Sequence, residues 1–176
     1  MTEIGDAARP VQILLVDDSP GDVSLTREAL HAGRVANQLH VVEDGEQAIA
    51  FMHRRGRHKN APVPDLVLLD LNLPRMDGRE VLRELKGDDT LRHVPIIVLT
   101  TSADEKDILT SYRLHANAYV KKPVEFGEFL VALQQLETFW LQIVRLPTAP
   151  APTPAPRYPL AHCQNVRSVV AVQQPG

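Results

Sequence analysis

Cysteine is almost absent from this sequence, since Cys163 is the only one among 176 residues. A single cysteine cannot form a disulfide within the chain, and it excludes a zinc site built on paired cysteines. Long hydrophobic runs are also missing, because no apolar stretch approaches the roughly 20 residues that span a bilayer. Residues 1–6 carry acids instead of the basic and apolar pattern of a signal peptide. These absences predict a soluble protein of a reducing compartment, the cytoplasm.

Negative charge outnumbers positive charge in the first five sixths of the chain. Residues 1–146 hold 17 of the 19 Lys and Arg residues and all 22 acids, which makes this part net −5. Proteins that bind nucleic acids usually contain a basic domain. We therefore expect neither nucleic acid nor a membrane as a partner.

The composition changes sharply at Pro147. Six of the 14 prolines lie within residues 147–159, where they alternate with Ala and Thr. Such a stretch forms neither a helix nor a central strand. We predict a disordered tail rich in Pro and Ala over residues 147–176, with a docking segment for a partner as the alternative. Residues 1–10 are predicted to be an N-terminal extension, which leaves residues 11–146 as one folded domain.

Apolar residues in this domain come in short unbroken blocks. The blocks are 13–16, 66–69 and 96–99, with 39–42 and 118–120 as weaker members. Strands without polar alternation are buried on both faces, as in parallel sheets. Segments with helical spacing follow the blocks, at 22–32, 46–53, 78–86, 104–114 and 125–145. The pattern predicts an α/β fold with a five-stranded parallel sheet and helices on both faces.

Polar residues stand directly after four of these predicted strands. Asp17 and Asp18 follow the first strand, Asp70 follows the third, Thr100 the fourth and Lys122 the fifth. Ligands bind at the carboxyl ends of the strands in open parallel sheets. We therefore expect three carboxylates, a hydroxyl and an ammonium group to converge at one edge of the sheet.

Crowded carboxylates repel one another, and a divalent cation removes that conflict. Oxygen ligands without paired His or Cys favour Mg²⁺ over zinc. An ionised aspartate can attack phosphorus and form an acyl phosphate. The metal, Lys122 and Thr100 would neutralise the oxygens of the transferred group. The residues thus predict phosphoryl transfer to a carboxylate.

Several short motifs carry a family resemblance. They are Asp-Asp at 17–18, Leu-Asp-Leu-Asn-Leu-Pro at 69–74, Met-Asp-Gly at 76–78, Leu-Thr at 99–100 and Lys-Pro at 122–123. Together they resemble the receiver domain of two-component response regulators over about residues 11–140. The resemblance implies a flavodoxin-like (βα)5 receiver fold with strand order 2-1-3-4-5, an order for which receivers are a known example.

The resemblance also implies a role for each matching residue. Asp70 becomes the phosphoacceptor, and Lys122 contacts the phosphoryl group. Asp17, Asp18 and Asp70 bind Mg²⁺ together with the backbone carbonyl of Asn72. Such a protein is a phosphoprotein that takes part in its own phosphorylation and dephosphorylation, not a classical enzyme.

Thr100 and Tyr119 match the pair that reorients after phosphorylation in this family. Ordinary packing beside Ala118 is the alternative role for Tyr119. Asn117 departs from the glycine-alanine pair that usually precedes the fifth strand, and Asn tolerates the left-handed backbone such a turn requires.

Further segments, at 99–102, 111–112, 114–119 and 139–141, resemble the small single-domain response regulators that serve bacterial phytochromes. This resemblance implies a sensor histidine kinase as partner, with a bacteriophytochrome as one candidate. The proline-rich tail offers no second domain for output. Signalling is therefore expected through contact with another protein or through phosphate relay to a histidine phosphotransfer protein.

Two alternative functions share parts of this pattern. A phosphatase with an aspartate nucleophile carries a second Asp two residues after the first, where this chain has Asn72. A flavodoxin-like mononucleotide binder needs a loop of Ser, Thr and Gly after the first strand, where Asp17 and Asp18 would repel phosphate. Both differences favour the signalling function.

Two segments remain outside this scheme. Residues 139–146 contain six apolar residues in eight at the end of a long predicted helix. They predict a homodimer through Phe139, Trp140, Ile143 and Val144, with folding back onto the first helix or the N-terminal segment as the alternative. The basic cluster at 53–59 is predicted at the end opposite the acids, either as a solvated loop or as a contact for an anionic partner.

Overall fold

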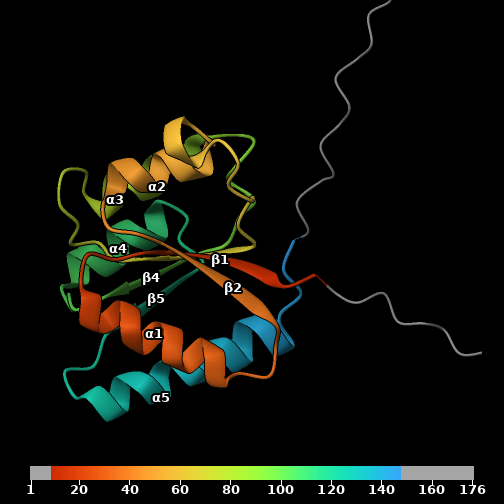
Figure 1. Cartoon of the computed structure of the whole chain (residues 1–176). Coiled ribbons are helices and arrows are strands. Elements are labelled where there is room, and N and C mark those ends of the chain that lie inside the picture. Colours follow the sequence, from red (N-terminus) through yellow and green to blue (C-terminus); the bar gives the residue numbers. More distant parts are fainter. Residues whose placement is uncertain (1–8, 148–176) are drawn as a thin grey trace, which may run out of the picture.

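The computed structural model describes residues 9–147, which form one sheet between two layers of helices (Figure 1). The strands are β1 (Val11–Val16), β2 (Asn37–Val42), β3 (Leu66–Leu69), β4 (Ile96–Thr100) and β5 (Ala118–Lys121). The helices are α1 (Pro20–Ala32), α2 (Gly45–Met52), α3 (Gly78–Gly87), α4 (Glu105–Arg113) and α5 (Phe126–Glu137). A short 3-10 helix, η1 (Gly56–His58), and a π-helix, η2 (Thr138–Ile143), complete the fold. All strands are parallel in the order β2-β1-β3-β4-β5, which confirms the predicted sheet.

Alternate residues of each central strand face opposite helical layers. In β1, Leu14 and Val16 belong to a buried cluster that includes residues of α2 and α3. Ile13 and Leu15 belong to a second cluster that includes residues of α1 and α5. None of these side chains is more than 1% exposed. Burial on both faces explains why the strands read as unbroken apolar blocks.

The end of the last helix differs from the predicted helix 125–145. The α-helix ends at Glu137, and the wider π-helical turn η2 continues the chain to Ile143. Trp140 is half-buried, because it packs against the cluster of Ile13, Leu30 and Leu136. This contact agrees with folding back for Trp140, and its part in a dimer interface stays a prediction. Phe139 and Ile143 remain exposed, and Val144 is half-buried.

The turn before β5 uses Asn117 in an unexpected way. The left-handed backbone lies at His115, where φ is 65°, and not at Asn117. The Asn117 side-chain oxygen instead accepts hydrogen bonds from the Ile96 amide at 2.9 Å and the Lys86 ammonium at 3.0 Å. Asn117 thus ties the turn to the start of β4 and to the end of α3.

The predicted tail beyond Pro147, including Cys163, and residues 1–8 of the predicted extension lie outside the described residues. Across residues 9–147, none of the helices has the length and apolar character needed to cross a membrane.

Candidate functional site

Asp17, Asp70 and Lys122 meet at the carboxyl edge of the sheet, where β1, β3 and β5 end. The Lys122 ammonium group lies 2.7 Å from an Asp17 oxygen and 2.8 Å from an Asp70 oxygen. All three side chains are buried, with at most 7% of each residue exposed. The structure therefore brings together residues that are up to 105 positions apart in sequence.

Lys122 also contacts a third carboxylate, Asp22, at 2.8 Å. An ammonium group has three N–H donors, so one donor is available for each carboxylate. Burial alone would lower the pKa of Lys122, but its hydrogen bonds to Asp17, Asp22 and Asp70 outweigh burial and raise it. Lys122 is therefore charged at any physiological pH, and the three carboxylates and one ammonium have a formal net charge of −2.

Asp22 is the residue of this site that the sequence analysis missed. It lies in the first turn of α1, where its backbone N–H donates to the Ser19 hydroxyl at 3.4 Å. An acid in a first helical turn is common, because the helix dipole favours negative charge there. The only available signal was its place in the first turn of the helix that follows β1, which begins at the same edge of the sheet.

Asp18 and Asn72 stand beside this cluster. Asp18 is exposed, next to the buried Asp17. The Asn72 backbone N–H donates to an Asp70 oxygen at 3.0 Å, which fixes the other side of that carboxylate. The donors are all oxygens, and the site has a surplus of negative charge, so its chemistry fits Mg²⁺. Over residues 9–147, no three His, Cys, Asp or Glu side chains are arranged as a metal-ligand set. The Lys122 ammonium group instead contacts both Asp17 and Asp70.

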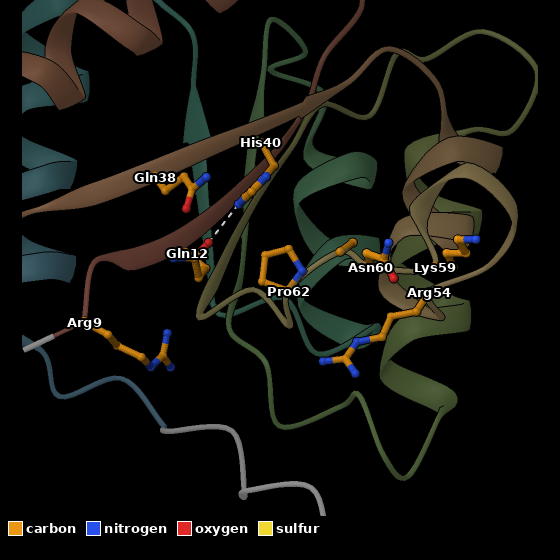
Figure 2. A pocket seen from close by; sticks show the side chains of 9 residues that line it. Arg9, Gln12, Gln38, His40, Arg54, Lys59, Asn60 and Pro62 are labelled. Carbon is orange, nitrogen blue, oxygen red and sulfur yellow. Dashed lines mark hydrogen bonds between the residues drawn. The ribbon is translucent and has the colours of Figure 1, made fainter.

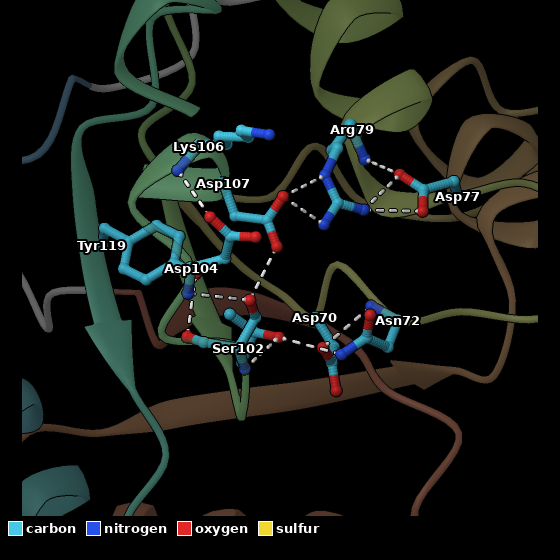
Figure 3. Close-up of polar contacts among 10 residues, drawn as sticks. Asp70, Asn72, Asp77, Arg79, Ser102, Asp104, Lys106, Asp107 and Tyr119 are labelled. Atoms are coloured by element: carbon cyan, nitrogen blue, oxygen red, sulfur yellow. Dashed lines mark hydrogen bonds and ion pairs between the residues drawn. The ribbon is translucent and has the colours of Figure 1, made fainter. Parts of the chain in front are cut away.

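Thr100 ends β4 and is completely buried. Its hydroxyl accepts weak hydrogen bonds of 3.4 Å from the Asn72 side-chain amide and the Ser102 backbone N–H. Tyr119, in β5, is half-buried and donates its hydroxyl to the Ser102 carbonyl at 2.9 Å (Figure 3). Ser102 thus connects the two residues that were predicted to act as a switch.

A polar network continues from Ser102 to the start of α3 (Figure 3). The Ser102 hydroxyl donates to Asp107 at 2.6 Å, and the Arg79 guanidinium contacts the same carboxylate at 2.6 Å. Arg79 also pairs with Asp77 at 2.8 Å. Asp77 and Glu80 form a capping box that begins α3. The network joins α3 to α4 beside the carboxylate of Asp70, and the sequence carries no signal for it.

Gly78 explains the Met-Asp-Gly motif in physical terms. A Cβ at this position would collide with the Asp70 carbonyl oxygen and the Leu71 Cα. The Gly78 backbone N–H donates to the Leu71 carbonyl at 3.0 Å. Glycine is therefore required because the start of α3 packs directly against the backbone of the predicted phosphoacceptor.

Comparison with known families settles what kind of domain this is. The model of the response regulator receiver domain matches residues 13–134. The chain belongs to the response regulator receiver family. The receiver is 44% identical over 140 residues to the response regulator Rcp1 of Synechocystis, a match that covers 80% of this chain and 95% of Rcp1.

Solved receivers support the same assignment. The Mn²⁺-bound form of Rcp1 has a TM-score of 0.78 at 44% identity and covers 79% of this chain and all of that one. The phosphorylated cyanobacterial phytochrome response regulator RcpA has a TM-score of 0.77 at 43% identity, with 79% and 99% coverage. The bacteriophytochrome response regulator AtBRR has a TM-score of 0.61 at 47% identity, with 74% and 95% coverage.

These relatives establish the receiver as a response regulator of two-component signalling, similar to those associated with phytochromes. The predicted fold and family are confirmed. None of these relatives is a phosphatase or a flavodoxin, so nothing favours the two alternative functions.

Proposed function

We propose that this receiver accepts a phosphoryl group from a histidine kinase on Asp70. The observation that carries the proposal is the Lys122 ammonium group, which contacts Asp70 at 2.8 Å while Asp17 and Asp22 hold its other two donors. In the reaction, an Asp70 oxygen attacks phosphorus and forms a P–O bond. The P–N bond of phosphohistidine breaks, and its electron pair returns to the imidazole nitrogen, which takes up a proton.

Lys122 and Thr100 would neutralise the oxygens of the transferred group. Lys122 already points an N–H at the position from which the attack begins, and Thr100 lies beside Asn72 at the end of β4. Asn72 supplies no carboxylate for proton transfer to water. The aspartyl phosphate should therefore persist as a signal instead of turning over as in a phosphatase.

Asp17, Asp18, Asp70 and the backbone carbonyl of Asn72 are the groups that would hold Mg²⁺. When bound, the metal supplies positive charge against the phosphoryl oxygens. Rcp1, which is similar to this chain, has been solved with Mn²⁺, which supports a divalent cation here.

Labelling by acetyl phosphate tests the metal directly. Wild-type protein should be labelled with Mg²⁺ and not with EDTA. Asp18→Ala should raise the Mg²⁺ concentration for half-maximal labelling by roughly tenfold, since the lost carboxylate ligand contributes about 1.4 kcal/mol. Asp89→Ala removes an exposed acid in the loop after α3 and should leave that concentration unchanged. Labelling that persists in EDTA would contradict the metal assignment.

The three contacts of Lys122 predict a positioning role for Asp22. Asp17 and Asp22 anchor two donors, so the third is aimed at the acceptor oxygen. Asp22→Ala should slow labelling roughly fivefold, equivalent to about 1 kcal/mol, and leave Mg²⁺ affinity unchanged.

Asp22→Asn keeps an oxygen acceptor and should recover most of the rate. Glu28→Ala, an exposed acid on the same helix, is the matched control. Faster labelling in Asp22→Ala would show that Asp22 competes with the phosphoryl group for Lys122.

The kinase partner is proposed to be a bacteriophytochrome. RcpA and AtBRR, which are similar to this chain, are described as phytochrome and bacteriophytochrome response regulators. This role requires the protein to be in the same compartment as the kinase domain, which we propose is the cytoplasm. We also propose that the protein is a homodimer. Output would occur through protein contact or through relay to a histidine phosphotransfer protein. Purified phytochrome kinases should label Asp70 faster than unrelated histidine kinases, and equal rates would contradict this partner.

A further inference from the structure

A hollow of about 680 Å³ lies at the amino end of the sheet (Figure 2). Asp70 follows the carboxyl end of β3, at the opposite end of the sheet. The starts of β1 and β2 form one side of the hollow, and the loop after α2 forms the other. We call it the basic hollow. Its lining residues are Arg9, Gln12, Gln38, His40, Arg54, Lys59, Asn60, Ala61 and Pro62. The predicted basic cluster at 53–59 contributes Arg54 and Lys59, and it does lie far from the acidic edge.

The sheet changes from apolar to polar at this corner. Side chains two residues apart on a strand share one face. On the face under α2, Leu14 and Val42 are buried core residues, whereas Gln12, Gln38 and His40 occupy the corresponding positions toward the amino end. Helix α2 has eight residues and spans about 12 Å, while the six-residue strands span about 20 Å. The helix therefore ends before the strands do, and their polar ends are only partly covered.

The polar side chains of β1 and β2 are held in place. A nitrogen of His40, Nε2, lies 2.8 Å from the Gln12 side-chain oxygen, and the His40 ring packs on Phe51 with centroids 5.3 Å apart. Burial lowers the pKa of His40 below its usual value, which favours the neutral ring. Because the Gln12 oxygen accepts, Nε2 of His40 carries the proton and Nδ1 remains an acceptor.

Positive charge surrounds these neutral side chains, and no carboxylate among residues 9–147 lines the hollow. Arg9 is fixed by two hydrogen bonds to Asp65, at 2.9 and 2.6 Å, which use part of its five donors. Within residues 9–147, Arg54 and Lys59 have no ion-pair partner. Arg54 has a left-handed backbone, with φ of 54°, just after α2 ends. Figure 2 shows the guanidinium groups of Arg9 and Arg54 reaching toward the hollow from opposite sides.

We propose that the basic hollow binds a small phosphorylated organic molecule. Guanidinium groups on two sides suit phosphate, because charge-assisted hydrogen bonds to phosphate oxygens are the strongest available to Arg. A volume of about 680 Å³ lies within the range of small-molecule sites and greatly exceeds the space of one phosphate group. Gln38 and Asn60 offer amide donors and acceptors to the organic part.

The hollow shares no residue with the Asp70 site. The proposal therefore stands or falls independently of phosphorylation, and a ligand here would act on a receiver whether or not Asp70 is labelled.

NMR of the full chain labelled with ¹⁵N, without Mg²⁺ and at constant ionic strength, tests the site with AMP as the probe. AMP should shift the backbone signals of Gln38, His40 and Asn60, and leave those of Asp17 and Asp70 in place. Adenosine should cause no shifts, because it lacks the phosphate. Inorganic phosphate should bind at least fivefold more weakly than AMP, because it cannot use Gln38 and Asn60.

Charge-matched variants distinguish specific binding of AMP in the basic hollow from attraction of AMP by the net charge of the protein. Arg54→Gln with Lys59→Gln should weaken AMP binding at least tenfold. Arg27→Gln with Arg113→Gln removes the same charge from exposed positions on α1 and α4, and should leave the affinity unchanged. The spectra of all variants report whether the fold is retained.

Three results would overturn the proposal. The first is no shift with AMP at millimolar concentrations. The second is an equal loss of affinity in both double variants, which would show attraction by net charge alone. The third is binding to vesicles of phosphatidylcholine with phosphatidic acid but not to AMP, which would assign the surface to a lipid headgroup.

Discussion

Asp70→Asn should abolish labelling by acetyl phosphate with Mg²⁺, to less than about 1% of the wild-type level, because an amide oxygen is not a nucleophile for phosphorus. The buried Asp70 carboxylate is held by Lys122 at 2.8 Å on one side and by the Asn72 N–H at 3.0 Å on the other. An asparagine of the same shape can fill this position, so the fold should persist. Phosphoprotein electrophoresis and intact mass, with a gain of one phosphoryl group, provide the measurement.

The control for this experiment is Asp89→Asn, which makes the same chemical change at an exposed loop position and should label normally. Thermal unfolding should show that Asp70→Asn is folded, since Lys122 retains Asp17 and Asp22 as partners. Stoichiometric labelling of folded Asp70→Asn would identify a different phosphoacceptor and contradict the proposed function. Failure of the kinase alone to label wild-type protein would instead concern only the choice of partner.

The strands and the order of elements were predictable because a strand that is buried on both faces appears in the sequence as a run of consecutive apolar residues. Blocks such as 66–69 coincide with the strand, and most helices begin within two residues of the predicted start. Asp17, Asp70 and Lys122 were predictable because parallel strands end at one edge. Their mutual contacts follow from that topology.

The rest of the site depended on geometry that local patterns do not encode. Asp22 has an ordinary local explanation at the start of α1, so its contact with Lys122, 100 residues away, was hidden. The Arg79–Asp107 pair joins two helices through side chains whose spacing carries no periodic signal. The sequence pattern also gives no signal for the change from α- to π-helix at Thr138. This change decides which of Phe139, Trp140 and Ile143 reach solvent.

The π-helical turn η2 changes which residues are exposed and available for the predicted dimer interface. The outer face of α5 and η2 carries a shallow apolar groove, lined by Val131, Gln134, Gln135, Thr138, Phe139 and Ile143. Val131 and Phe139 are each 51% exposed, and Ile143 is 67% exposed. Large apolar side chains gathered on one face are typical of interaction surfaces. A second copy offers a self-complementary face, as a twofold dimer requires.

We expect the double variant Phe139→Ala, Ile143→Asp to convert a dimer of twice 19.6 kDa into a monomer in sedimentation at tens of micromolar. Truncating one aromatic anchor of an interface costs about 2 kcal/mol, which weakens dimerisation roughly thirtyfold, and a buried acid adds to the loss. Trp140 is left intact because it packs on its own core, where Trp140→Ala would create a cavity and confuse dissociation with unfolding.

Val124→Asp provides the matched control, because Val124 is 97% exposed in the loop before α5 and lies outside the groove. It introduces the same charge and should leave the dimer intact. Asp70 lies outside the groove, so the double variant should be labelled by acetyl phosphate as fully as wild type. A wild-type protein that sediments as a monomer both before and after labelling would contradict the dimer, because the exposed Phe139 and Ile143 would then remain in contact with water in either state.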